Sequence, residues 1–220
     1  PWLVPDDWDG PARQAADAAI ETYIEKNGMF AFQAAVSIGQ HHHADGLFFG
    51  GQAPSWSRRT IEALAGEHLM QRSHVALIDF HTGLGPRGHG ELISVDVPGG
   101  AEHLRTVAWY GDEVATPASG DSVSADVQGT IEVGYHAMLQ NTESTTIAIE
   151  FGTLPSDQVL QALRADNWLY LRGDVASPDG QSIKRDVRAA FYGEDSAWNK
   201  DVWERGLEIA RATIRGLADS

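Results

Sequence analysis

The sequence has no cysteine. This absence excludes disulfide bonds, a thiol nucleophile and thiolate metal ligands, so any metal ion must be held by His, Asp and Glu side chains. It leaves the redox state of the compartment open, and the cytoplasm is the working expectation.

Basic side chains are also scarce, with 16 Lys and Arg residues against 31 Asp and Glu residues and a net charge of −15. Such a charge repels phosphate backbones and anionic lipid, and no local basic patch offsets it, which argues against nucleic acid and membrane surfaces as partners. Long apolar runs are missing too, because runs such as residues 75–80 fall far short of the roughly 20 residues that cross a bilayer. Since 42% of the residues are hydrophobic, we expect a single domain with its own core over residues 1–220.

Helical patterning covers most of the chain. The clearest helix is expected from Pro11 to the terminating Gly28, where apolar side chains recur at helical spacing and Asp9 can serve as the N-cap. Seven more helices are expected at residues 30–38, 57–70, 102–110, 130–139, 156–171, 182–191 and 198–217.

Strands are fewer than helices. Residues 75–80 (VALIDF) and 145–151 (TTIAIEF) are short apolar runs typical of strands buried on both faces of a parallel sheet, and residues 92–95 suggest a further strand. Together with the helices they predict an α/β fold with a mostly parallel sheet covered by helices. Such sheets have about five or six strands. Either the pattern hides strands, or the sheet is incomplete without an N-terminal portion.

Polar side chains occur near the carboxyl ends of the two main strands. Asp79 and His81 are two residues apart and therefore share one face of the first strand. Glu150 is a charged residue near the end of the other strand, where burial would raise its pKa toward the range useful to a general base. Open α/β sheets bind their ligands at this edge. When the two positions are considered together, a functional centre and an ordinary structural role explain these residues equally well.

These segments resemble known motifs. IDFHTGLGPRGHGEL and TTIAIEFGTLP are similar to the third metal ligand and catalytic-glutamate motifs of zinc carboxypeptidase-like hydrolases, which include carboxypeptidase A, succinylglutamate desuccinylase and aspartoacylase. The chain most resembles a bacterial branch of unknown function, through DWDGP (7–11), HADGLFFGGQAPSWS (43–57) and LQALRADNWL (160–169). The resemblance covers nearly all of the chain, with its motifs in the expected order, and it implies a carboxypeptidase-like fold.

The resemblance also implies residue roles. His81 would be a zinc ligand and Glu150 the general base that activates the attacking water, while zinc polarises the scissile carbonyl. Asp79 would orient His81 from behind it, or would have a plain structural role. The family's two other zinc ligands form an H-x-x-E motif upstream of the region that resembles the start of this chain, and no H-x-x-E occurs in these 220 residues. Because catalytic zinc needs about three protein ligands, we expect the C-terminal portion of such a hydrolase, whose N-terminal portion could be a separate partner chain.

Further polar residues have two interpretations each. The triple histidine at 41–43 is expected to be loop structure rather than a metal clamp. His89 and Glu91 could line the pocket, or reach zinc if the site has been rebuilt. Arg59 and Arg87 could bind a substrate carboxylate in a bidentate manner, although a surface ion pair is the slightly favoured interpretation of each.

The sequence thus predicts a zinc-dependent hydrolase of an amide bond in a small peptide (a carboxypeptidase) or in an N-acyl amino acid (a deacylase). Activity would require the H-x-x-E pair to be supplied from elsewhere. The alternative is a non-catalytic binding or assembly subunit that keeps the fold without the full metal site.

Overall fold

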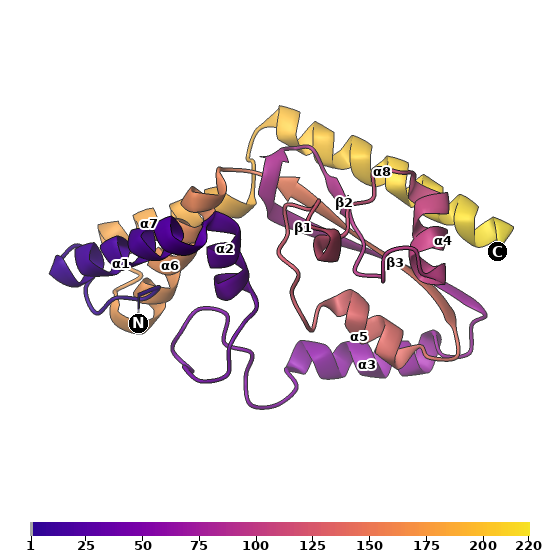
Figure 1. Cartoon of the computed structure of the whole chain (residues 1–220), viewed down its shortest axis with the longest axis horizontal. Coiled ribbons are helices and arrows are strands. Elements are labelled where there is room, and N and C mark those ends of the chain that lie inside the picture. Colours follow the sequence, from indigo (N-terminus) through magenta and orange to yellow (C-terminus); the bar gives the residue numbers. More distant parts are fainter. Residues whose placement is uncertain (1) are drawn as a thin grey trace.

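The computed structural model describes residues 2–220 as an α/β fold (Figure 1). Within these residues it contains eight α-helices, one short 3-10 helix and three strands. The helices are α1 (Pro11–Asn27), α2 (Met29–Ser37), α3 (Trp56–His68), α4 (Ala101–Tyr110), η1 (Pro117–Ser119), α5 (Ile131–Met138), α6 (Ser156–Arg172), α7 (Pro178–Phe191) and α8 (Ser196–Asp219). The strands are β1 (His74–Arg87), β2 (Glu91–Ile93) and β3 (Glu143–Gly152).

All eight expected helices are present, with ends that differ by a few residues. Side-chain caps explain several of the starts, because Ser55, Thr130 and Ser177 each accept a backbone N–H from the first turn of α3, α5 and α7. The predicted Asp9 cap of α1 is wrong. Gly10 is the N-cap and provides no side chain, and the Asp7 carboxylate accepts the amide of Ala12 at 3.4 Å instead.

The sheet has the order β1-β3-β2, with β1 parallel and β2 antiparallel to the central strand β3. It is therefore a small mixed sheet rather than a mostly parallel one. Nine of the ten residues of β3 are buried, as its apolar sequence predicts. The prediction that the first strand is buried on both faces is wrong, because β1 is an edge strand and Phe80 is 52% exposed.

The two faces of the sheet differ in character. Odd-numbered residues of β3 (Ile147, Ile149 and Phe151) pack in the main apolar core with residues of α4 and α8. Even-numbered residues face the other way, where His136 of α5 contacts Ser144 and Thr146. Figure 1 shows the same division, with α4 and α8 on one side of the sheet and α3 and α5 on the other.

The helices α1, α2, α6 and α7 form a group beside the sheet (Figure 1). Arg164 of α6 is fully buried in this group. Its guanidinium donates to the carbonyl oxygens of Trp2 and Leu3 and to the Asp17 carboxylate at 2.7–2.9 Å, so one side chain joins α6, α1 and the N-terminal arm.

The helices of residues 2–220 are too short or too polar to span a membrane.

Candidate functional site

The predicted pairing of His81 with Glu150 is confirmed by the geometry. The two residues are aligned partners in the parallel ladder between β1 and β3. Glu150 lies near the carboxyl end of β3, and His81 lies two residues before the regular pairing of β1 ends at Gly83, although β1 itself continues to Arg87. Their side chains point to the same face of the sheet, and His81 Nδ1 lies 3.8 Å from Glu150 Oε2. A parallel register shared over ten consecutive pairs, from His74 with Glu143 to Gly83 with Gly152, fixes this alignment.

Asp79 holds the other nitrogen of the same imidazole. Its Oδ2 atom lies 2.8 Å from His81 Nε2, as the shared strand face predicts. The hydrogen bond with Asp79 raises the pKa of His81 against the lowering effect of burial, and the negative charges of Asp79, Glu150 and Glu132 add to the increase. The His81 side chain is 54% exposed. Asp79 therefore orients the ring and leaves Nδ1 turned toward Glu150.

Glu150 is nearly buried, with 8% of its surface exposed. Its Oε1 atom accepts the backbone N–H of Leu84 at 2.9 Å. Burial raises the pKa of Glu150, and the increase outweighs the opposing effects of the Leu84 hydrogen bond and of His81. The strand ends thus give a carboxylate whose pKa is shifted in the direction that a general base at neutral pH requires.

The two predicted arginines have other contacts. The Arg87 guanidinium pairs with the Asp195 carboxylate and donates to the carbonyl oxygen of Gly193 at 2.7 Å. Arg59 lies on α3 and donates to the carbonyl oxygen of Pro54. Neither guanidinium contacts His81, Asp79 or Glu150 within residues 2–220, so a substrate-binding role for either one stays a prediction.

A cavity of about 530 Å³ opens beyond the carboxyl ends of β1 and β3. Leu84, which bonds Glu150, is one of its lining residues, and Arg87 is another. The cavity also reaches the first turn of α6 through Pro155 and Ser156. It lies where an open α/β sheet binds its ligands.

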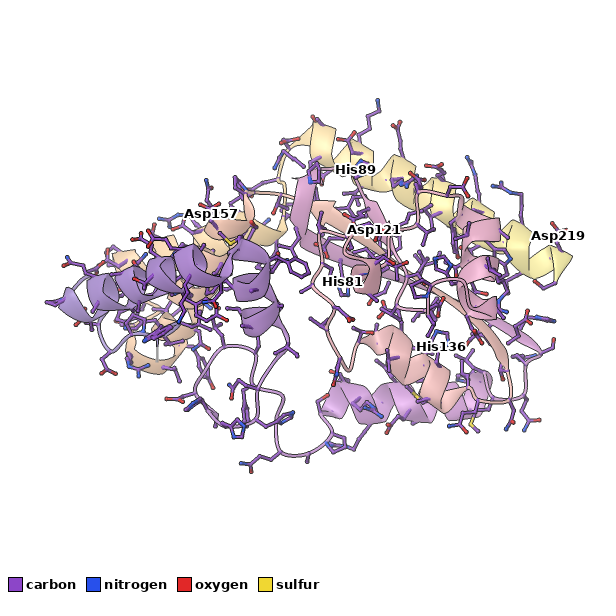
Figure 2. The ribbon with its side chains drawn as sticks, viewed as in Figure 1. His81, His89, Asp121, His136, Asp157 and Asp219 are labelled. Atoms are coloured by element: carbon purple, nitrogen blue, oxygen red, sulfur yellow. The ribbon has the colours of Figure 1, made fainter. Side chains whose placement is uncertain are left out.

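His89 and Glu91 take different positions. Glu91 aligns with Glu150 across β2 and β3, and its carboxylate accepts the amide of Val123 at 3.0 Å. His89 is exposed in the turn before β2, and Figure 2 shows it close to α8 and away from His81. The left-handed backbone of Gly90, with φ of +66°, breaks the strand alternation that would have put both side chains on one face.

The triple histidine lies in a loop with its own hydrogen bonds. The Gln40 side chain accepts the amides of His42 and His43, and His41 Nδ1 lies 2.8 Å from the carbonyl oxygen of Gly51. These contacts agree with the loop-structure interpretation. His43 also lines a second cavity of about 520 Å³, between the N-terminal arm, α1 and α2.

The sequence matches the family described as "Protein of unknown function (DUF2817)" over residues 1–205. The chain belongs to this family. No curated protein and no solved structure matches the chain. The family description assigns no activity, so the function of this DUF2817 protein has to be argued from its site.

His81 of this protein is arranged like one ligand of a zinc site. An imidazole oriented by a carboxylate on its remote nitrogen is the usual arrangement for a metal-binding histidine, and His81 has it through Asp79. Among residues 2–220, no group of three or more His, Asp and Glu side chains is placed to hold a metal ion. His81 could thus provide one ligand, and a complete site would need others.

Two features of this polar face were not predicted. Glu132, in the first turn of α5, is 3% exposed, and its negative charge contributes to the raised pKa of His81. Buried Asp96 contacts half-buried His136, with Asp96 Oδ1 3.1 Å from His136 Nε2. Asp96 and His136 are 40 positions apart in the sequence, so no local pattern indicates their contact. The local signal for Glu132 was its place as an acidic residue in the first turn after the Thr130 cap, which is common in surface helices.

Proposed function

We propose that this DUF2817 protein is a zinc-dependent hydrolase of an amide bond in a small peptide or an N-acyl amino acid, on a carboxypeptidase-like fold. The observation that supports this proposal most is the convergence of Asp79, His81 and Glu150 at the carboxyl edge of the sheet. The edge combines an oriented imidazole with a buried carboxylate. The neighbouring cavity is lined by Leu84, whose N–H bonds Glu150, and by none of the three side chains themselves.

In this proposal His81 provides one zinc ligand through Nδ1, and Asp79 keeps the ring in the required orientation. When bound, zinc would polarise the scissile carbonyl and make the attacking water more acidic. The remaining ligands would come from an H-x-x-E pair, which the resemblance to zinc carboxypeptidase-like hydrolases places upstream. His81 alone is insufficient, since catalytic zinc sites have about three protein ligands.

Glu150 would carry the proton transfers. Its carboxylate accepts a proton from the water whose oxygen attacks the amide carbon, and it then donates that proton to the leaving nitrogen as the C–N bond breaks. The Leu84 N–H fixes Oε1, which leaves Oε2 as the oxygen nearer to His81. Burial favours the protonated carboxyl that the second transfer needs.

The second candidate function is a non-catalytic binding or assembly subunit. The observation in its favour is the absence of a three-ligand metal group within residues 2–220. This alternative predicts no amide hydrolysis by the full-length natural protein and no effect of a change at Glu150 beyond stability.

Replacement of Glu150 by Gln tests the hydrolase proposal, because it keeps the size of the side chain and removes the base. We expect turnover of peptide or N-acyl amino acid substrates by the full-length natural protein to fall about 10²- to 10⁴-fold, with zinc content and folding nearly unchanged. Glu143→Gln, at the exposed opposite end of β3, is the matched control and should keep its activity.

Two outcomes would count against the proposed role. Near-normal turnover of the Glu150→Gln variant would show that Glu150 is not the base. Unfolding of that variant would favour a structural role, in which the carboxylate mainly secures the Leu84 loop.

A further inference from the structure

The sheet has one long open edge, along β1. This strand pairs with β3 over the residues from His74 to Gly83, and among residues 2–220 no strand pairs with its other side. In the same part of the chain, residues 74–82 make no backbone hydrogen bond outside the ladder with β3. Because a paired strand directs only some of its N–H and C=O groups toward its neighbour, about half of these groups face the open edge.

This edge lacks the features that usually protect an edge strand. Natural proteins keep such strands very short, place Lys or Pro on them, or twist them away with a bulge. Between His74 and Gly83 there is no Lys, Arg or Pro, and the irregularity in the ladder comes only after Gly83. The acidic residue of this stretch, Asp79, is already in contact with His81. Since an uncovered apolar strand promotes aggregation, we expect this edge to be covered in the natural protein.

The apolar side chains of β1 are also less covered than those of β3. Ile147 and Ile149 of β3 are 0% exposed, whereas Phe80, which is aligned with Ile149, is 52% exposed. The Phe80 ring stacks on Phe151 of β3, with ring centroids 6.3 Å apart, and lies against Gly206 of α8. These contacts cover only part of the ring, so an aromatic surface remains uncovered on the edge strand.

A second exposed aromatic side chain belongs to the same region. Trp203 precedes Gly206 by three residues on α8, so the two residues lie on neighbouring turns of the same helix face. Trp203 is 69% exposed, and Gly206 lies against Phe80. The open edge thus combines free backbone donors and acceptors with apolar side chains beside them. A further β-strand satisfies both, through ladder hydrogen bonds and through packing of its side chains.

The charge of the chain favours a strand of the same polypeptide over a second copy. Each copy carries a net charge of −15, so two copies repel each other. A strand that is covalently connected to this chain has a high effective concentration at the edge. It also covers the edge permanently, as protection from aggregation requires.

We propose that the outer edge of β1 pairs with a further β-strand of the full-length natural protein, supplied by residues outside these 220, and that an apolar side chain of this strand packs on Phe80. The inference does not depend on the proposed hydrolase function. The added strand would lie on the opposite side of β1 from Glu150. Its side chains would therefore extend the sheet face that bears Asp79 and His81.

Photo-crosslinking of the full-length natural protein tests this inference. Phe80→p-benzoylphenylalanine places a photoreactive aromatic side chain at the edge, and mass spectrometry identifies the peptides that it captures. We expect capture, within the same molecule, of an apolar segment outside residues 1–220. Tyr170→p-benzoylphenylalanine is the matched control, because Tyr170 is an exposed aromatic residue of α6, and it should not capture that segment.

The other results of this experiment would overturn the inference. They are capture of a second copy of the chain, capture of a different protein, capture of residues 1–220 alone, and capture of the same segment from both Phe80 and Tyr170. A natural reading frame that encodes no residues beyond these 220 would overturn it as well.

Hydrogen exchange of the unmodified full-length protein decides the question even if a variant does not fold. We expect the amides from Val75 to Phe80 to exchange at rates within about tenfold of one another, because each has a hydrogen-bond partner. An open edge would leave every second amide exchanging about 100-fold faster than its neighbours. Such an alternation would show that no strand covers β1.

Discussion

Gly152 ends β3 two residues after Glu150, at the point where the backbone of β1 comes closest. A side chain here would collide with the carbonyl oxygens of Gly85 and Pro86. Both Gly83 and Arg87 pair with Gly152 across an irregularity in the ladder. The absence of a Cβ atom therefore lets the loop return tightly enough for the Leu84 N–H to reach Glu150.

Replacement of Gly152 by Ala should push this loop away. We expect a loss of about 1–3 kcal/mol in the free energy of unfolding, as for an overpacked core, together with lower activity, because the Leu84–Glu150 hydrogen bond depends on the loop. Urea unfolding would measure the change. Gly134→Ala in α5 meets only Met138, at 3.6 Å, and should be neutral or stabilising; equal effects of the two changes would contradict this account of the loop.

Helix α5 is joined to the buried Asp96 carboxylate through His136. Burial opposes ionisation of Asp96, but hydrogen bonds with His136, Ser94 and Thr106 outweigh it and place the pKa of Asp96 below its ordinary value of 3.8. A carboxyl whose pKa is lower in the folded state stabilises the fold above its unfolded pKa. This contribution is lost as the pH falls through the folded pKa.

Asp96→Asn should therefore cost about 1–3 kcal/mol of unfolding free energy at pH 7, and the difference from wild type should shrink as the pH falls below 4. Urea titrations at several pH values would measure it. Asp219→Asn, at the exposed end of α8, should match wild type throughout. A difference that stays constant from pH 7 to pH 3 would show that the charge of Asp96 does not stabilise the fold.

The elements also show what local sequence can predict. Helices depend on nearby residues, so caps such as Thr130 and stops such as Gly28 marked them well. The edge position of β1 depends on which strands are present beside it, which its own apolar sequence does not specify. The contact of His136 with Asp96 depends on a helix orientation set by residues far away in the sequence, and no local pattern could predict it.

In the molecule as a whole, the residues of the candidate site lie on one face of the small sheet. The apolar face packs on α4 and α8, and the polar face, which α5 contacts through Ser144 and Thr146, bears Asp79, His81 and Glu150. The sequence was sufficient to predict these three positions, because strand alternation and parallel register determine where side chains at strand ends point. The sequence did not predict which charged side chains surround these three residues, because they come from β2, β3 and α5, which are far apart in the chain.

Zinc content is the property that bears most directly on the proposed hydrolase. We would purify the full-length natural protein without chelators and measure zinc per chain by mass spectrometry, for wild type, Glu150→Gln and His81→Ala. We predict one zinc per chain in wild type and in Glu150→Gln, and a large loss in His81→Ala, because His81 is the proposed ligand and Glu150 is not. Wild-type protein without zinc, or His81→Ala that still binds one zinc per chain, would contradict the account.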